Sequence, residues 1–159
     1  MVDSRAKGAR TETVARDALR KHTGLSWERV PGSGALDPKH QLKGDLYVPN
    51  HQNLFAVEVK GYADDHLTSQ VITSKTPQLL EWWKQAYRQG CQLNRHPLLI
   101  FKFDRSKLFV AFEDLPNMNN YPYMYVCREG YEFFVALLDD WLQHEQPKFV
   151  AWIHKVKML

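Results

Sequence analysis

The chain has 159 residues and a formal net charge of +3 at pH 7; 44% of its residues are hydrophobic and 25% are charged. This composition predicts one globular domain over residues 1–159 and argues against a disordered tail and against a membrane helix, which needs roughly 18–20 apolar residues in a row. The two cysteines argue against a disulfide framework, and the polar N-terminal segment lacks the apolar core of a signal peptide, so we expect a cytoplasmic protein without membrane contacts.

The first half of the chain predicts a helix followed by three strands. Apolar residues recur at the helical period over residues 4–23. A short strand is expected at 27–30, before a loop rich in glycine and proline. Two further strands, 45–48 and 54–60, flank a short segment of residues that favour turns, and this arrangement predicts a hairpin.

The second half adds two helices and more strands. Thr76 is a good helix cap with Pro77 at the first helical position, and Gly90 is a suitable helix end. The other elements are expected as a buried strand over 97–103, a strand over 108–112, an edge strand over 123–126, a helix over 129–142 and a short strand over 149–153. This order predicts an α/β fold with a central mixed β-sheet flanked by helices.

The predicted hairpin brings two acidic residues together. If its turn is centred between His51 and Gln52, Asp45 lies directly across from Glu58, with Cβ atoms roughly 4.5–5.5 Å apart. Lys60 follows two residues later on the same face. Like charges in this position destabilise a sheet, so the pair requires a cation: either a divalent metal such as Mg²⁺, or Lys60 alone on a solvated hairpin. The apolar sequence around Glu58 favours the metal, because burial of an unpaired charge is costly.

These residues resemble a known family. Gly44-Asp45, a spacer and Glu58-Val59-Lys60 resemble the signature of the PD-(D/E)XK nucleases, with Gly44 in place of the proline. Further elements resemble the archaeal-type Holliday junction resolvases, which some phages also carry. These elements are Lys7-Gly8 with Glu12, the run from Arg29 to Gly34, a helix carrying Gln78, and an apolar strand ending in Phe103-Asp104-Arg105. The resemblance extends over residues 5–112 and implies a restriction-endonuclease-like core.

The resemblance implies a site for phosphodiester hydrolysis. It implies Mg²⁺ as the cofactor, with Mn²⁺ as a substitute, bound by Glu12, Asp45, Glu58 and the backbone carbonyl of Val59. Lys60 would position or polarise the attacking water and stabilise charge that builds on the phosphate. Ser33 lies between two glycines and would contact the scissile group, although a flexible turn is the alternative interpretation of this segment.

The same resemblance implies branched DNA as the substrate. Contacts to DNA are expected from four basic residues and from one polar residue at a helix start: Arg5, Lys7, Arg10, Arg29 and Gln78. The expected activity is Mg²⁺-dependent resolution of four-way junctions by paired symmetric nicks, as used in DNA recombination and repair. Two symmetric nicks require two active sites, which implies a homodimer. A phage-encoded enzyme would act in the host cytoplasm.

Two alternatives to junction resolution stay open at this point. The first is a PD-(D/E)XK nuclease of another DNA specificity, either restriction-like or repair-nicking. The second is a catalytically silent DNA-binding module that keeps the same fold.

Overall fold

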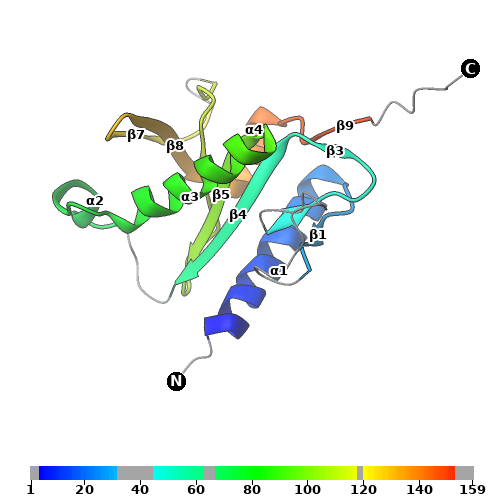
Figure 1. The fold of residues 1–159 in the computed structure, drawn as a ribbon, viewed down its shortest axis with the longest axis horizontal. Coiled ribbons are helices and arrows are strands. Elements are labelled where there is room, and N and C mark those ends of the chain that lie inside the picture. The colour runs from blue at the N-terminus through cyan, green and yellow to red at the C-terminus, as the bar shows by residue number, and fades with distance from the viewer. Residues whose placement is uncertain (1–3, 32–44, 63–66, 118–119, 153–159) are drawn as a thin grey trace, which may run out of the picture.

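The computed structural model describes residues 4–31, 45–62, 67–117 and 120–152, with side chains from Gly8 onward. A mixed seven-stranded β-sheet forms its centre, in which β4 and β5 are parallel and the other neighbours are antiparallel (Figure 1). In spatial order the strands are β1 (Glu28–Arg29), β2 (Leu46–Tyr47), β4 (Phe55–Tyr62), β5 (His96–Phe103), β6 (Phe109–Phe112), β8 (Tyr131–Leu137) and β7 (Met124–Arg128). The predicted α/β fold with a mixed sheet is therefore confirmed.

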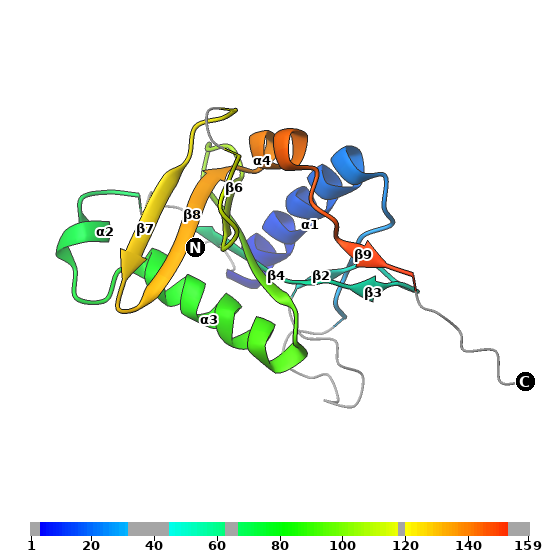
Figure 2. The same cartoon turned by 90° about the horizontal axis from the view of Figure 1, so that it is seen from above.

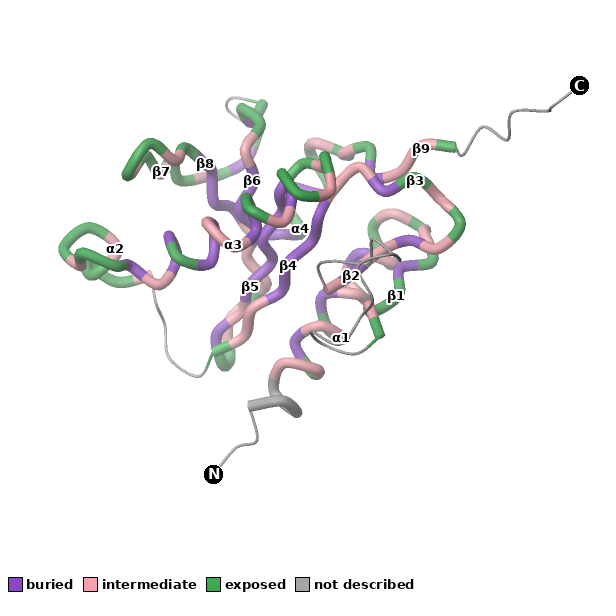
Figure 3. The backbone as a smooth tube through the Cα atoms, viewed as in Figure 1, coloured by how far each residue is buried: buried purple, intermediate pink, exposed green. Residues whose placement is uncertain are grey.

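Helices cover both faces of this sheet. Helices α1 (Ser4–Thr23) and α4 (Leu138–Glu145) lie on one face, and α3 (Gln78–Leu93) lies on the other (Figure 2). The short helix α2 (Gln70–Thr73) precedes α3. Each face has its own hydrophobic core, and the central strands β4 and β5 are buried between the two cores (Figure 3). No helix in the described part of the chain combines the length and apolar character that a membrane crossing requires.

Strand β4 contributes to both faces because its side chains alternate. Val57 and Val59 join the core under α1 and α4. Glu58 points to the opposite face, where a side chain of α3 contacts it. Further along, Gly61 lies so close to α1 that a methyl group there would overlap the Thr11 side chain. The glycine therefore lets the N-terminal half of α1 pack directly on the end of β4.

The turn after β2 is held by a side chain. Asn53 accepts a hydrogen bond from the Val48 N–H through Oδ1 at 2.8 Å and donates from Nδ2 to the Val48 carbonyl at 2.9 Å. Asn53 also belongs to β3 (Gln52–Asn53), which pairs with β9 (Val150–Ala151) in a separate two-stranded sheet. The predicted short strand over 149–153 is thus present, and its partner is the turn segment of the hairpin.

The helix predicted over 129–142 is wrong in its first half. Residues 131–137 form β8, which lies between β6 and β7, and only Leu138–Glu145 is helical. The segment from Phe133 to Ala136 is buried at every position. Aromatic and branched residues in such a run suit an interior strand that is covered on both faces, so tertiary burial outweighs the apparent helical pattern.

The ends of α3 also differ from their predicted positions. Pro77 is the cap residue rather than the first helical residue, and it provides no side-chain cap. The helix continues through Gly90 to Leu93 and ends at Asn94, which has a left-handed backbone with φ of 53°. Gly90 is needed for packing instead of termination, because a methyl group there would lie 2.8 Å from the Arg95 carbonyl oxygen.

Candidate active site

The N-terminal end of β2 brings Asp45 against β4 in the predicted register. Leu46 pairs with Val57, so the preceding residue, Asp45, lies across from Glu58. The Asp45 N–H donates to the Val57 carbonyl at 2.7 Å, and Asp45 Oδ2 accepts a hydrogen bond from the Val59 N–H at 2.7 Å. The side chains of Asp45 and Glu58 are also hydrogen-bonded to each other. The predicted meeting of the two acids is confirmed.

Within this acidic pair Glu58 is buried and Asp45 is partly buried, and the positive charge of the described residues does not balance the two groups. Only 2% of Glu58 is exposed. Burial, followed by the charge of Asp45, raises the pKa of Glu58 from 4.5 to about 8, although Lys60 opposes this change. Burial also raises the pKa of Asp45 from 3.8 to about 6; the Val59 hydrogen bond lowers it and the charge of Glu12 adds to the increase. Both pKa values are thus raised, and the two groups titrate as a pair that tends to keep a proton when no cation is bound.

Two glutamines of α3 hold the Glu58 carboxyl group. Gln85 Nε2 donates to Glu58 Oε2 at 3.4 Å, and the Gln89 side chain is also hydrogen-bonded to Glu58. Gln89 Oε1 is buried and has no hydrogen-bond partner among the described residues. A buried acceptor without a donor is unfavourable by roughly 1–3 kcal/mol, so this oxygen is suited to a hydrogen bond from water or a ligand in the site.

Sequence reasoning missed both of these glutamines. The available signal was their spacing, because Gln85 and Gln89 are four residues apart and share one face of the helix with Gln78 and Gln92. That pattern alone does not show which strand the face meets.

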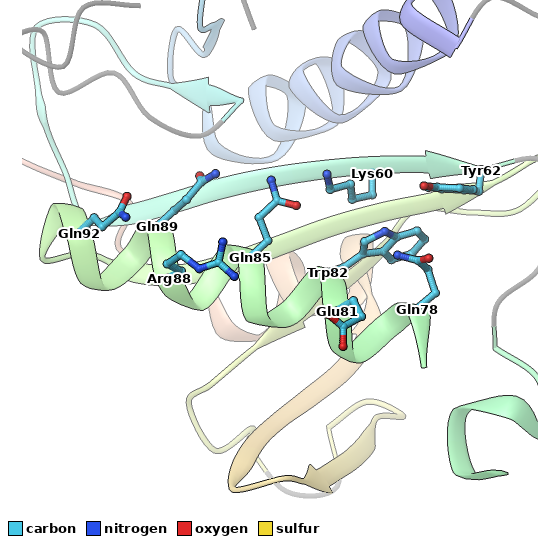
Figure 4. A pocket seen from close by; sticks show the side chains of 9 residues that line it. All are labelled: Lys60, Tyr62, Gln78, Glu81, Trp82, Gln85, Arg88, Gln89 and Gln92. Carbon is cyan, nitrogen blue, oxygen red and sulfur yellow. The ribbon is translucent and has the colours of Figure 1, made fainter. Parts of the chain in front are cut away.

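A cleft of about 600 Å³ opens between α3 and the second half of β4. Figure 4 shows its lining, in which Gln85 and Gln89 point from α3 toward β4. The lining side chains are Lys60 and Tyr62 from β4, and Gln78, Glu81, Trp82, Gln85, Arg88, Gln89 and Gln92 from α3. Lys60 and both glutamine partners of Glu58 belong to this lining, so Glu58 lies directly behind the wall of an open cleft.

Glu12 approaches the pair from α1 but has a partner of its own. Its Oε2 accepts a hydrogen bond from Arg29 Nε at 2.9 Å, and its charge acts on Asp45. Arg10 is exposed one half-turn earlier on the same helix. The structure thus brings Glu12, Arg29 and the acidic pair into one neighbourhood. Ser33 lies outside the described residues, as do the side chains of Arg5 and Lys7 on α1.

The residues present fit a divalent cation. Burial is the main cause of the raised pKa values of both carboxyl groups, nearby negative charge adds to it, and Lys60 does not offset the increase. A cation in place of the shared proton would allow both groups to ionise. Mg²⁺ binds one or two protein carboxylates and keeps several waters, and the unpaired oxygen of Gln89 can accept a hydrogen bond from water in the cleft.

A second group of possible ligands lies at the other end of the sheet. His96, Glu113 and Asp114 bring one ligand atom each within 4.8 Å of one another, and His96 Nδ1 lies 2.9 Å from Glu113 Oε1. His96 pairs with Phe55, at the opposite end of β4 from Lys60. The hydrogen bond between His96 and Glu113 accounts for the proximity of these two side chains, and we assign no metal to this group.

Comparisons with known proteins point to one family. A family model described as "Phage putative PDDEXK endonuclease" matches residues 3–151. Protein D14 of Escherichia phage T5 is 41% identical over 150 residues, which cover 90% of this chain and 94% of that protein. Among solved structures, Hjc, a Holliday junction resolvase from Archaeoglobus fulgidus, is similar at 17% identity with a TM-score of 0.42, over 86% of this chain and 88% of Hjc.

Proposed function

The chain belongs to the phage PDDEXK endonuclease family, and we propose that it is a divalent-metal-dependent endonuclease that resolves four-way DNA junctions by paired symmetric nicks. The observation that carries this proposal is the meeting of two carboxyl groups, on buried Glu58 and partly buried Asp45, next to the open cleft that Lys60 lines. Such a site combines a place for a cation, an ammonium group and room for a phosphodiester.

Asp45 and Glu58 would hold the cation, which is Mg²⁺ or its substitute Mn²⁺. The carbonyl of Val59 is the third ligand in this proposal. Its N–H already points to the Asp45 carboxylate, and the N–H and carbonyl of a strand residue point to the same side. That carbonyl therefore points toward the edge where the β2 pairing ends. When bound, the cation would supply a Lewis acid beside the phosphate and lower the pKa of water.

The remaining site residues act through charge and position. Lys60 lies in the cleft and would position the attacking water and stabilise negative charge on the phosphate. Glu12 adds negative charge beside Asp45, which strengthens the attraction for a cation. The Arg29 hydrogen bond fixes the orientation of the Glu12 carboxylate.

Contacts to the DNA backbone would come from the surroundings of this site. We assign them to Arg5, Lys7, Arg10 and Arg29, with Ser33 at the scissile group and Gln78 at the mouth of the cleft. A four-way junction has two-fold symmetry, so paired nicks would need two copies of the site and hence a homodimer.

The test is cleavage of a synthetic four-way junction by the wild-type protein and by Asp45→Asn, with and without Mg²⁺. We expect Mg²⁺-dependent cleavage by the wild-type protein and a loss of roughly 10²-fold or more in the variant. Asp139→Asn is the matched control, because Asp139 is an exposed acid on α4 that should leave cleavage unchanged. Equal cleavage by the wild-type protein and Asp45→Asn would contradict the site assignment.

A substrate panel separates junction resolution from the two alternatives. Equal rates on plain duplex, flap, nicked and four-way DNA would indicate a nuclease of another specificity. Tight junction binding without cleavage in Mg²⁺ or Mn²⁺ would indicate a silent binding module.

A further inference from the structure

We propose that the pocket around Arg95, at the C-terminal end of α3, binds a backbone phosphate of the substrate DNA a few nucleotides away from the scissile bond. This inference rests on the proposed function, because it assigns a further contact to the same substrate. The DNA contacts proposed above for α1 come from the other face of the sheet, so Arg95 would add a separate anchor on the face that α3 covers (Figure 2).

The first observation is a cation that lies in a pocket without an acidic partner. Arg95 is half-buried and lines a pocket of about 340 Å³, to which Gln52 and Asn94 also contribute. Among the residues that the structure describes, no carboxylate forms an ion pair with Arg95. Burial lowers the pKa of its guanidinium group. An anion would stabilise a cation in this place, and the planar donors of a guanidinium group fit a phosphate.

The second observation is that the end of the helix fixes the position of Arg95. Helix α3 ends at Asn94, which has a left-handed backbone, and the Arg95 N–H donates to the Gly90 carbonyl at 2.8 Å. This is the longer of the two hydrogen bonds that close a Schellman motif. A residue that is already fixed in this way loses less conformational freedom on binding than a residue in an open loop.

The negative groups near Arg95 have partners of their own. Glu113 is the acid in the lining of this pocket, and its Oε1 is hydrogen-bonded to His96 Nδ1 at 2.9 Å. The Gly90 carbonyl at the helix end accepts the N–H groups of Asn94 and Arg95. The guanidinium group of Arg95 is therefore the charge that decides which ligand the pocket prefers, and it prefers an anion.

The place of the pocket predicts which phosphate it would bind. Leu54 lines the pocket, and Glu58 follows four residues later along the strand. Since a strand rises about 3.3 Å per residue, the pocket lies about 13 Å from Glu58 along β4. One strand of duplex carries a phosphate for about every 3.4 Å of its axis, so Arg95 would reach a phosphate roughly four nucleotides from the scissile one. Arg88 in the lining of the cleft precedes Arg95 on α3 and would face the backbone between these two phosphates (Figure 4).

The test neutralises one phosphate of the DNA at a time. All proteins carry Asp45→Asn so that the four-way junction stays intact, and each phosphate near the cleavage position is replaced in turn by an uncharged methylphosphonate. Junction affinity is measured by titration in Mg²⁺ for the reference protein, Arg95→Gln and Lys84→Gln. Lys84→Gln is the control because it removes the same charge from the same helix, where Lys84 forms ion pairs with Glu81 and Glu129.

We expect one methylphosphonate, roughly four nucleotides from the cleavage position, to weaken binding by the reference protein and by Lys84→Gln roughly 3- to 10-fold. Arg95→Gln should bind unmodified DNA more weakly by a similar factor, and this methylphosphonate should then have no further effect. The slope of log affinity against log salt concentration should fall by about 0.9 in Arg95→Gln and stay unchanged in Lys84→Gln. Arg95→Lys keeps the charge and should restore the slope.

An unchanged salt slope in Arg95→Gln would overturn the phosphate pocket and leave the nuclease proposal intact. Equal effects of every methylphosphonate on Arg95→Gln and the reference protein would do the same. A loss in Arg95→Gln that Arg95→Lys does not restore would assign Arg95 a structural role and also overturn the pocket. If the protein with native Asp45 cuts no DNA, the proposed function itself fails, and the pocket fails with it as a contact to a nuclease substrate.

Discussion

The face of the sheet under α1 and α4 differs sharply from the face under α3. The first is packed by apolar side chains such as Leu19 and Trp141. The second has an apolar core around Trp83, but beside it lies the polar cleft with Lys60. Strand β4 supplies valines to the first face and Glu58 to the second, so alternate residues of one strand serve stability and chemistry separately.

The largest expected effect on cleavage comes from Glu58, on the face of the sheet under α3. Glu58→Gln keeps the shape of the side chain and removes the charge that would bind the cation. We expect junction cleavage to fall roughly 10²- to 10³-fold, measured as the single-turnover rate in saturating Mg²⁺. Glu113→Gln, at the other end of the sheet, should leave the rate unchanged. Full activity in Glu58→Gln would show that the acidic pair is not the active site.

On the face under α1 and α4, a core substitution should lower the stability of the protein and leave its cleavage rate nearly unchanged. Leu19 on α1 is fully buried against the sheet, and Leu19→Ala should lower the free energy of unfolding by about 2–5 kcal/mol, measured by urea denaturation. Below its unfolding temperature the variant should cut junctions at nearly the wild-type rate per folded molecule. A large loss of rate in the folded variant would contradict the separation of the two faces.

The pH dependence of stability tests the buried charge directly. Folding raises the pKa of Glu58 from its ordinary value of 4.5 to about 8. It raises the pKa of Asp45 from its ordinary value of 3.8 to about 6. Between these values the folded state keeps protons that the unfolded chain has lost. The metal-free protein should therefore lose stability as the pH rises from about 4 to about 8.

Thermal unfolding in chelator at pH 5 and pH 8 measures this effect. Glu58→Gln should reduce the difference between the two pH values, because it removes the titrating group. Mg²⁺ should stabilise the wild-type protein more at pH 8 than at pH 5, since a cation replaces the proton. An equal or greater stability of the metal-free protein at pH 8 would contradict the assigned pKa directions.

The same comparison explains which parts of the structure the sequence predicts. The register of Asp45 and Glu58 is predictable because strand side chains alternate strictly and a short turn leaves few ways to pair. The six strands predicted before residue 127 are all present within two residues of their expected bounds. The segment 131–137 is different, because a continuous apolar run suits a buried helix and a buried strand equally well.

The glutamines of α3 show a second limit. Their spacing indicates one polar helix face, but the strand that this face meets depends on how α3 packs across the sheet. Gly90 illustrates the same point. Its small size is required by the Arg95 carbonyl on a later segment, and local sequence suggests a helix end instead. The packing of α3 against β4 decides the first feature, and the path of the chain just after the helix decides the second.

The smallest expected effect concerns Gln89, where the polar cleft meets the buried pair. Gln89→Leu removes a hydrogen bond to Glu58 and also removes the unpaired Oε1, so the two effects on metal-free stability oppose each other. Unfolding free energy should change by less than about 1 kcal/mol. Affinity for Mn²⁺, measured by calorimetry, should fall on the order of 10-fold, because Glu58 loses a group that orients it. Gln143→Leu on α4 controls for the loss of an exposed amide, and equal Mn²⁺ affinity in both variants would show that Gln89 does not position Glu58.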